Sequence, residues 1–323
     1  MRSLTIDDVL SARRHLDGRL PATPMWSYPA LDAEVGATVF VKHENVQPVG
    51  SFKVRGGLAL LAGMSAAERS QGLVSYSTGN HAQSLAYAGA AFGVRCQVVM
   101  PENANPAKVR AIRSFGGEPV LHGAELDHSR EHAERLAHDQ GLHLVSPGDT
   151  LALLAGVGTA YLEILTAEPD LDAIVVPVGS GTGAAAACVV ANAVAPGCRV
   201  IAVQSHAAPA AHDSWRAGEC LRRPNRTRVE GLATGTGFEL TQRTLRVGLA
   251  DFLLVTDEQI FSAQRLLASH AHTLAEGAGA AALAGVLSRS GDFTGKRIAI
   301  VCTGGNASPT EIAGLAYATA VTP

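Results

Sequence analysis

The sequence predicts an α/β fold in which helices flank two open, mainly parallel, twisted β-sheets. Short β-rich runs alternate along the 323 residues with longer runs of helical pattern. Several of the β-rich runs are apolar throughout, as in "DAIVVPVG" at 172–179. Strands that are apolar on both faces are typical of parallel sheets covered by helices on both sides, and the alternation with helices favours β-α units.

The individual elements follow from the same pattern. Strands are expected at 37–44, 72–77, 96–101, 141–146, 172–179, 199–205 and 297–305. Helices are expected near 53–63, 80–92, 105–115, 124–139, 150–166, 183–195, 257–270 and 277–289. Because ligands bind at the carboxyl ends of strands in open parallel sheets, the glycine-bearing turns after these strands are the candidate functional segments.

Two domains are expected. Residues 75–148 hold three or four β-α units and predict a smaller domain that covers the active site, whereas 1–74 and 149–323 predict a larger, cofactor-binding domain. The polar, glycine-rich stretch 216–238 predicts a long functional loop rather than a linker.

The composition argues against several classes of protein. The net charge is −3 without a basic block, which argues against a nucleic-acid partner. No apolar run reaches the roughly 18 residues that a membrane span needs. The five cysteines are scattered without a C-x-x-C pair, so we expect free thiols and a cytoplasmic protein.

The stretch "VPVGSGTGAAAA" predicts a phosphate-binding loop. Residues Gly179, Ser180, Gly181, Thr182 and Gly183 join an expected strand to an Ala-rich helix. Glycines let backbone N–H groups converge, hydroxyls add donors, and a helix N-terminus supplies positive potential. Two alternatives stay open: a turn that uses small residues only for packing, and a dinucleotide fingerprint.

The fingerprint interpretation is the weaker of these alternatives. The pattern Gly179-x-Gly181-x-x-Ala184 fits a relaxed dinucleotide motif. That motif requires an acidic residue about 20 positions later, at the end of the next strand. The expected strand at 199–205 carries Gln204 near its end instead.

A second polar turn follows the expected strand at 72–77. Ser77 and Thr78 carry hydroxyls, Asn80 both donates and accepts, and Ser77 is a candidate helix cap. Backbone N–H groups of the same turn could bind a carboxylate. His81 is more typical of packing or capping here than of catalysis.

Lys53 stands out because the chain has four lysines against 22 arginines and places this one in the apolar stretch "GSFKVRGG". Desolvation lowers the pKa of an ammonium and makes the amine a nucleophile, which arginine cannot become. These residues alone are equally compatible with a Schiff-base lysine and with a surface lysine whose stem packs at a helix start.

Taken together, the four segments "GSFKVRGG", "YSTGNHAQS", "VPVGSGTGA" and "VCTGGNAS" resemble the fold-type II pyridoxal-phosphate (PLP) enzymes. The resemblance is to the serine/threonine dehydratase and serine racemase group, and it covers nearly the whole chain. It implies that Lys53 forms the Schiff base with PLP and that Phe52 borders the cofactor. It also implies that Asn80 binds the phenolic oxygen.

The remaining implied roles concern phosphate, ring and substrate. Gly179, Ser180, Gly181, Thr182 and Gly183 would hold the phosphate, and Thr303 would face the pyridine nitrogen as a neutral partner. Ser77, Thr78, Gly79 and His81 would receive the substrate carboxylate. Thr78 stands where the racemases of this group carry a serine that acts as acid or base, so Thr78 is the second candidate catalytic residue.

The resemblance implies an ammonia-lyase that removes water from L-threonine, L-serine or 3-hydroxyaspartate, with dehydratases of hydroxyectoine utilisation among the similar proteins. A serine or aspartate racemase is the runner-up, and a nucleotide-binding module is the alternative of another class. We expect a homo-oligomer, either a dimer or a tetramer, and no metal. Gln204 and Ala210 stand where metal-binding members of the family carry acidic ligands. His128 and His132 share a helix face without an evident third ligand.

Overall fold

The computed structural model describes residues 2–316. The chain divides into two compact units. The first combines the residues up to Pro21 with Phe52–Thr159, and the second combines Ala22–Ser51 with the residues from Ala160 on. The expected smaller domain, 75–148, lies wholly inside the first unit. The domain boundaries drawn from the sequence stay a prediction, since compactness alone does not define an independently folding domain.

The first unit is built on a four-stranded sheet in which every pairing is parallel, with the order β5-β4-β3-β6. Its strands are β3 Leu73–Tyr76, β4 Cys96–Met100, β5 Glu118–Leu121 and β6 His143–Val145. Its helices are α1 Ile6–Leu16, α3 Lys53–Gly63, α4 Ala66–Gln71, α5 Asn80–Phe92, α6 Pro106–Ser114 and α7 Leu126–Gln140. Helix α8, Leu151–Ala167, carries residues of both units.

Helix α3 belongs to the first unit because it packs closely against α5. A Cβ on Gly57 would lie 2.6 Å from the carbonyl oxygen of Ser84. On another side of α3, a Cβ on Gly156 of α8 would lie 2.4 Å from the carbonyl oxygen of Arg55. These contacts allow only glycine at the two positions and explain why residues 52–74 associate with the segment that follows them.

The second unit is built on a six-stranded sheet with the order β1-β2-β10-β7-β8-β9, in which only β1 is antiparallel to its neighbour. Its strands are β1 Met25–Ser27, β2 Thr38–His43, β7 Ala173–Pro177, β8 Arg199–Ser205, β9 Asp251–Val255 and β10 Arg297–Cys302. Its helices are α2 Pro29–Val35, α9 Thr182–Val194, α10 Ala210–Ala217, α11 Glu239–Gly248, α12 Asp257–His270, α13 Gly277–Ser288, α14 Ser290–Phe293 and α15 Pro309–Ala316.

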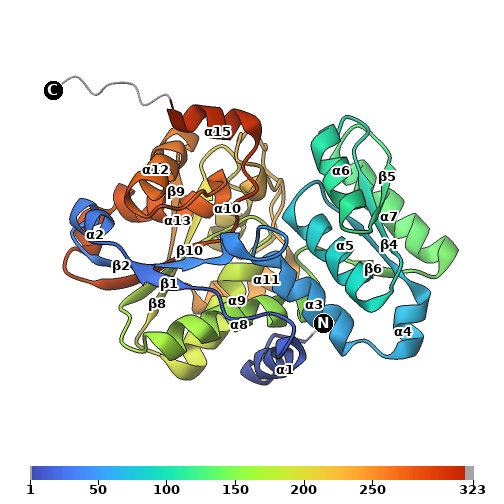
Figure 1. Ribbon diagram of the computed structural model, residues 1–323, viewed down its shortest axis with the longest axis horizontal. Coiled ribbons are helices and arrows are strands. Elements are labelled where there is room, and N and C mark those ends of the chain that lie inside the picture. The colour runs from blue at the N-terminus through green and yellow to red at the C-terminus, as the bar shows by residue number, and fades with distance from the viewer. Residues whose placement is uncertain (1, 317–323) are drawn as a thin grey trace. The chain divides into compact units, whose positions relative to one another are not determined.

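Both faces of this larger sheet are covered. Val175, Ile201 and Val203 point into the core cluster beneath α12 and α13, whereas the alternate residues Val176 and Ala202 point to the opposite face and are also fully buried. Helices α9 and α13 pack against the sheet, and Figure 1 shows them on its two sides. The predicted class, with two mainly parallel sheets and flanking helices, is confirmed.

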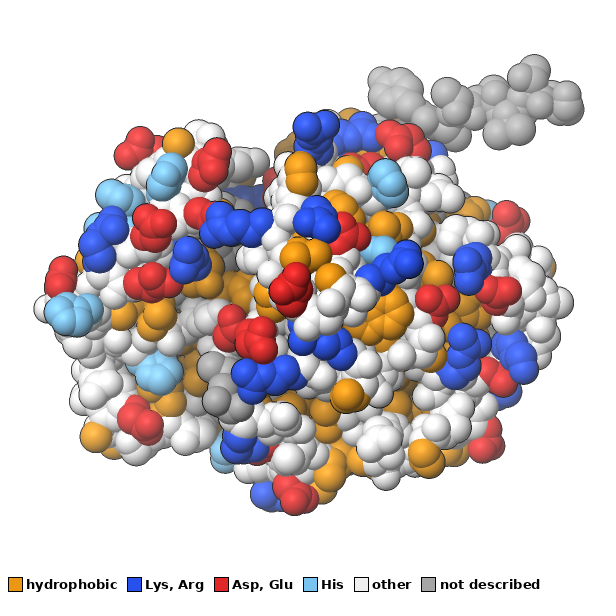
Figure 2. Space-filling view, turned by 180° about the vertical axis from the view of Figure 1, so that it is seen from behind, with side chains coloured by type: hydrophobic (Ala, Val, Ile, Leu, Met, Phe, Trp, Pro, Cys, Tyr) orange, Lys and Arg blue, Asp and Glu red, His pale blue; other side chains and the backbone are white. Residues whose placement is uncertain are grey.

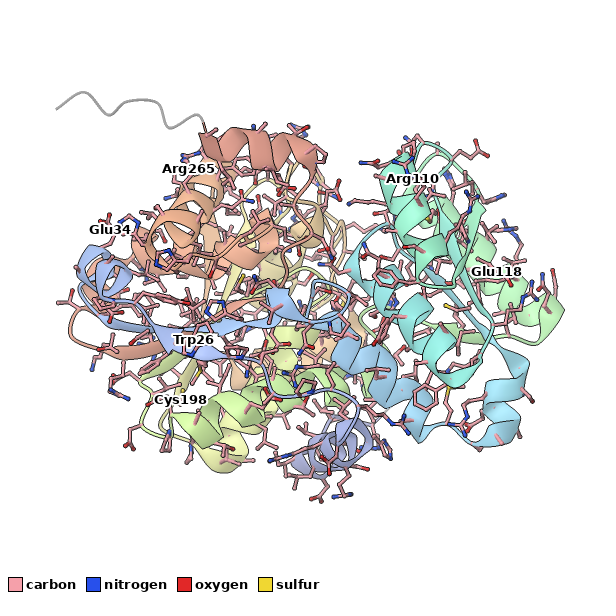
Figure 3. All side chains as sticks on the ribbon, in the orientation of Figure 1. Trp26, Glu34, Arg110, Glu118, Cys198 and Arg265 are labelled. Atoms are coloured by element: carbon pink, nitrogen blue, oxygen red, sulfur yellow. The ribbon has the colours of Figure 1, made fainter. Side chains whose placement is uncertain are left out.

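Every expected strand and helix is present, and the bounds shift by a few residues at most. Three strands and seven helices were not predicted from the sequence: β1, β5 and β9, and α1, α2, α4, α10, α11, α14 and α15. Strand β1 has three residues and lies at the sheet edge, and its Trp26, labelled in Figure 3, has a side chain that is 55% exposed. Strand β5 contains Pro119, which is tolerated because β5 is also an edge strand.

Two surface features bear on the predicted partners. Within residues 2–316 no helix is long and apolar enough to cross a bilayer. Basic and acidic side chains alternate over the face drawn in Figure 2. The predictions about nucleic acid and membrane partners are not tested further by the structure.

Candidate active site

Lys53 is the first residue of α3, directly after the buried Phe52. Its Nζ atom lies 5.1 Å from the centre of the Phe52 ring. Desolvation by burial lowers the pKa of Lys53 from 10.5 to about 8. A neutral amine is therefore populated near neutral pH, which favours the nucleophile interpretation of this lysine over the surface-stem interpretation.

The second polar segment of the first unit joins β3 to α5. Helix α5 begins after Gly79, whose N-cap position has no side-chain hydrogen bond. Ser77 does not cap the helix as the sequence suggested: its Oγ atom accepts a hydrogen bond from the Gly79 N–H, 3.2 Å away. The first N–H groups of α5 therefore remain suited to an anionic ligand such as a carboxylate. Thr78 and Asn80 are half-buried in the same turn.

His81 points away from this turn into the interior of the first unit. Its Nε2 atom lies 2.9 Å from Ser75 Oγ, and that hydroxyl donates to the Val145 carbonyl at 2.6 Å. Because the hydroxyl has a single proton, His81 Nε2 must be the donor. The side chain is thus committed to Ser75, and only the backbone N–H of His81 is left for the predicted substrate contact.

Helices α3 and α5 each begin one helical turn before the residue through which they pack against each other. Gly57 is one helical turn after Lys53, and Ser84 is one turn after Asn80. Burial first, and then the charge on Lys53, lowers the pKa of His81 to about 3. The charge of Lys53 therefore reaches the start of α5, so the lysine and the substrate loop predicted from the sequence are neighbours in the first unit.

In the second unit, the predicted phosphate loop joins β7 to α9. Gly181 is the N-cap of α9, with φ +87, and no side chain caps the helix. A Cβ on Gly179 would lie 2.3 Å from the carbonyl oxygen of Gly231, so this position also requires glycine. Ser180 and Thr182 lie in the turn itself, and Gly183 is in the first turn of the helix. The backbone of this loop can come close to a phosphate.

The end of β10 supplies the remaining predicted residue. Thr303 is 4% exposed and follows Cys302, the last residue of the strand. Gly304 pairs with Ser51 in an isolated antiparallel bridge. Burial raises the pKa of the Cys302 thiol far above its usual range, so this cysteine is a core residue and not a nucleophile.

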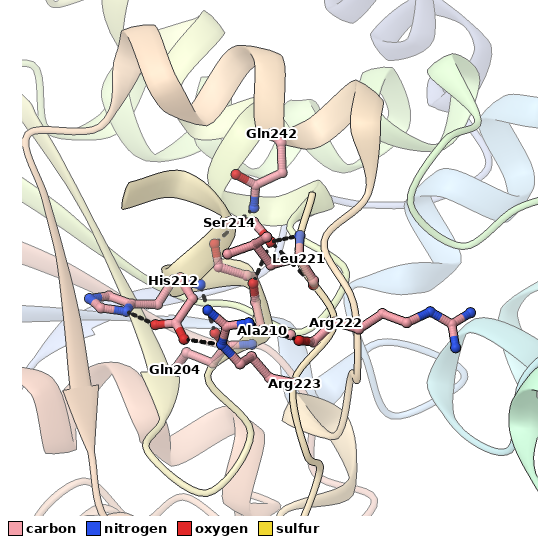
Figure 4. Close-up of polar contacts among 10 residues, drawn as sticks. Gln204, Ala210, His212, Ser214, Leu221, Arg222, Arg223 and Gln242 are labelled. Carbon is pink, nitrogen blue, oxygen red and sulfur yellow. Dashed lines mark hydrogen bonds and ion pairs between the residues drawn. The ribbon is translucent and has the colours of Figure 1, made fainter. Parts of the chain in front are cut away.

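Gln204 and Ala210, which the resemblance places where the family's metal ligands would stand, offer no carboxylate. Gln204 Oε1 accepts a hydrogen bond from the His212 N–H at 3.0 Å, and Ala210 lies at the start of α10 (Figure 4). No group of three potential metal-ligating side chains occurs among residues 2–316. The absence of a metal stays a prediction. His132 stacks on His122 at 3.9 Å between ring centres, and His128 does not join them in a candidate metal group.

The residues present fit PLP. The cofactor carries a phosphate, and the second unit offers a glycine loop that opens a helix without a side-chain cap. It carries an aldehyde, and the first unit offers an amine with a lowered pKa. Ser51 Oγ, two residues before Lys53, is buried and has no hydrogen-bond partner within the described part of the chain. A polar ligand beside Lys53 would give that hydroxyl a partner.

Residues 17–304 match the family described as "Pyridoxal-phosphate dependent enzyme". The chain belongs to this family. The fold-type II interpretation and PLP as the cofactor are thereby confirmed.

Individual members of the PLP-dependent family are similar over most of the chain. An L-threonine ammonia-lyase of Thermotoga maritima is 34% identical over 304 residues, which cover 94% of this chain and 76% of the relative. An L-threo-3-hydroxyaspartate ammonia-lyase of Pseudomonas sp is 32% identical, and the match covers 98% of this chain and 99% of that protein. The crystal structure of serine racemase from Dictyostelium discoideum matches with a TM-score of 0.89 at 30% identity, covering 95% of this chain and 100% of the other.

The structure adds residues that the sequence analysis did not single out. Thr234 and Thr241 donate hydrogen bonds to carbonyl oxygens of the phosphate loop, and Ser51 lies beside the lysine segment. The glycine-rich composition of 216–238 was the one available signal for Thr234. Nothing in the sequence separated Thr241 from any other helical threonine.

Proposed function

We propose that this PLP-dependent enzyme is an ammonia-lyase that removes water from a β-hydroxy amino acid and releases a 2-oxo acid and ammonia. The observation that carries the proposal is Lys53, an amine whose pKa is lowered to about 8 beside the N-terminus of α5. Ammonia-lyases are among the relatives that match nearly the whole chain. The substrates we propose are L-threonine, L-serine and 3-hydroxyaspartate.

Bound PLP supplies an electron sink conjugated to the substrate's amino group. Lys53 would bond to the cofactor between turnovers. Once displaced by the substrate amine, Lys53 would take the proton from the α-carbon, for which a pKa near the working pH is suited. The Lys53 ammonium formed in this way would return the proton to the departing β-hydroxyl, which would leave as water with the electron pair of its C–O bond. One water is then consumed when the released enamine hydrolyses to the 2-oxo acid and ammonia.

The turn at the start of α5 would bind the substrate. We assign its carboxylate to the loop Ser77, Thr78, Gly79 and His81, because this helix start has no side-chain cap. The N–H groups of Thr78 and His81 and the two hydroxyls would donate, since the N–H groups of Ser77 and Gly79 already donate to the Val99 carbonyl and to Ser77 Oγ. Asn80 would donate its amide N–H to the phenolic oxygen of the cofactor, and Phe52 would lie against the cofactor ring. The Thr78 hydroxyl would serve as a second acid or base.

Two further groups of residues would bind the phosphate and the pyridine nitrogen of the cofactor. The loop Gly179, Ser180, Gly181, Thr182 and Gly183 would hold the phosphate through backbone N–H groups and hydroxyls. Thr303 would hydrogen-bond the pyridine nitrogen. A hydroxyl cannot keep that nitrogen protonated as a carboxylate does, and the weaker electron sink favours prompt loss of the β-substituent over transamination.

The test is a panel of β-hydroxy amino acids incubated with the PLP-loaded enzyme and scored for 2-oxo acid and ammonia. We expect turnover of at least one of L-threonine, L-serine and L-threo-3-hydroxyaspartate, with equal amounts of the two products. A preparation that shows the visible absorbance of lysine-bound PLP and converts none of them would contradict the proposal.

A racemase is the second candidate, because a serine racemase matches at 30% identity and a TM-score of 0.89. Racemisation needs an acid or base on each face of the substrate, and Thr78 offers a hydroxyl with an added methyl group in place of serine. Chiral analysis of the amino acid left after partial turnover separates the two activities. An ammonia-lyase leaves the L form, and a racemase accumulates the D form.

Finer assignments complete the proposal. We propose a cytoplasmic enzyme, which agrees with five cysteines that are all free, and a homodimer, which sedimentation of the PLP-loaded protein would test. A role in hydroxyectoine utilisation rests on the form of the segment "STGNHAQS". Loss of growth on hydroxyectoine after deletion of the gene would support it.

A further inference from the structure

Two threonine side chains hold the carbonyl groups of the phosphate loop. Thr241 Oγ1, from the first turn of α11, lies 3.0 Å from the Ser180 carbonyl oxygen. Thr234 Oγ1 donates to the Gly179 carbonyl oxygen at 3.2 Å. Both contacts lie within the second unit. Two successive carbonyls of one short loop are thus turned toward protein hydroxyls.

The direction of these carbonyls determines the direction of the amides. A trans peptide unit is planar, and its C=O and the following N–H point in opposite directions. The carbonyls of Gly179 and Ser180 share their peptide planes with the N–H groups of Ser180 and Gly181. When the threonine hydroxyls bind these carbonyls, the two N–H groups must point to the opposite side of the loop, away from the threonines.

Thr241 is well placed for this role. It is 1% exposed, and a Cβ added to Gly181 would lie only 2.9 Å from its Oγ1. The single hydroxyl proton of Thr241 is shared with the Phe238 carbonyl, 3.1 Å away. Thr234 is half-buried and its hydrogen bond is longer, so its contribution is the smaller of the two.

The segment that carries Thr234 is itself anchored at two places that precede this residue in the chain. Asp257, at the start of α12, accepts hydrogen bonds from Thr227 Oγ1 at 2.7 Å and from the Arg228 N–H at 2.8 Å. Near α10, Asp213 pairs with Arg223 at 2.6 Å, and Ser214 Oγ accepts from the Leu221 N–H at 2.9 Å (Figure 4). The loop at 216–238 is therefore a fixed support, and its Gly231 carbonyl lies directly against Gly179.

We propose that Thr241 and Thr234 are positioning residues for the cofactor phosphate, because they orient the N–H groups of Ser180 and Gly181 toward it. The inference rests on the proposed function, since it assumes that the loop binds the phosphate of PLP. Neither threonine touches the cofactor itself. Each acts through the peptide unit whose carbonyl it holds.

The test replaces the hydroxyl with a methyl group of the same shape. We expect Thr241→Val to weaken the binding of PLP to the apoenzyme about fivefold to tenfold, as the loss of one supporting hydrogen bond predicts. The binding of pyridoxal, which lacks the phosphate, should be unchanged within about twofold. Thr241→Ser keeps the hydroxyl and should bind PLP like the wild type. Thr234→Val should also weaken the binding of PLP and not that of pyridoxal, but by a smaller factor than Thr241→Val.

Absorbance titration of each apoprotein with PLP and with pyridoxal gives both affinities, and the melting temperature of the apoprotein reports folding. Equal losses for PLP and pyridoxal, or an unchanged PLP affinity in Thr241→Val, would overturn the inference. If Thr241→Val does not fold, the affinities of Thr234→Val for PLP and for pyridoxal test the inference by the same criteria. Wild-type protein that fails to bind PLP at all would instead remove the proposed function on which the inference rests.

Discussion

The two units hold their functional residues by different physical means. In the first unit, Lys53 is held by close backbone packing, because Gly57 and Gly156 leave room for nothing larger than hydrogen. In the second unit, the phosphate loop is held by side-chain hydrogen bonds to its carbonyls from Thr234 and Thr241. The loss of a hydroxyl should therefore damage the second arrangement and not the first. Added volume should damage both, because Gly179 in the second unit also leaves no room for a Cβ.

The largest effect is expected from removing the lysine of the first unit. Lys53→Ala should lower turnover by on the order of a thousandfold or more, because both the bond to PLP and the α-proton base are lost. The absorbance of lysine-bound PLP should disappear with it. Lys296→Ala is the matched control, since Lys296 is an exposed lysine paired with Asp172 at 3.3 Å. Normal turnover in Lys53→Ala would refute the mechanism.

The next effect tests the packing of α3. Gly57→Ala would place a methyl group 2.6 Å from the Ser84 carbonyl oxygen, and we expect a loss of about 1–3 kcal/mol in the free energy of unfolding, the usual cost of overpacking. Turnover should also fall, since the start of α3 would move relative to α5. Gly63→Ala in the same helix is the control, because the nearest atom to its Cβ is a His15 side-chain carbon at 3.4 Å. Equal stabilities of the two variants in urea would show that α3 does not depend on the close approach.

A pH effect of similar or smaller size should arise in both units. Burial lowers the pKa of His81 to about 3 and that of His43 to about 4. The unfolded chain takes up protons below about pH 6.5 while these folded histidines remain neutral, so stability falls as the pH drops. Each should cost up to about 2 kcal/mol at pH 5 relative to pH 7.

Urea denaturation of the apoprotein at pH 7 and pH 5 measures this loss of stability in the wild type and in the variants His81→Gln and His43→Gln. Each variant should lose less stability than the wild type between pH 7 and pH 5. A substitution of His138, which is exposed beside Asp139, serves as the surface-histidine control. A pH dependence identical in all variants would mean that neither buried histidine controls it.

The smallest effect is expected from chelation. EDTA should leave the activity of the PLP-loaded enzyme within about twofold, a change worth less than 0.5 kcal/mol. Gln204 is bonded to the His212 N–H, and Ala210 offers no carboxylate. Magnesium added back afterwards should also have no effect. A large loss that magnesium reverses would place an ion in this enzyme.

The sequence predicted those features that depend on local pattern. Strands such as β7, "AIVVP", are apolar on both faces, and helices such as α9 begin directly after a glycine turn. The glycine turn at 179–183, Lys53 at a helix start and the turn at Ser77 all lie where the pattern put them, and their roles stay predictions. Each of these signals lies within about a dozen consecutive residues.

Features that depend on distant segments could not be predicted. The hydrogen bond from Thr241 to the Ser180 carbonyl joins positions 61 residues apart, and no periodicity encodes it. His81 was expected at the substrate, yet its side chain turns inward because Ser75 and the Val145 carbonyl, 64 positions away along the chain, complete its hydrogen bond. The Ser77 cap was wrong for a local reason: the helix starts after Gly79, so Ser77 lies outside it.

The most direct test of the account is to locate the lysine that bonds PLP. The purified PLP-loaded enzyme is reduced with borohydride, digested and examined by mass spectrometry, with the four lysines Lys42, Lys53, Lys108 and Lys296 as the candidates. Lys42 is the buried lysine to compare with Lys53, because its Nζ atom is paired with Glu163 at 2.6 Å. We predict the phosphopyridoxyl group on Lys53 in nearly all molecules. Attachment at Lys42, Lys108 or Lys296, or no attachment in an active enzyme, would contradict the account.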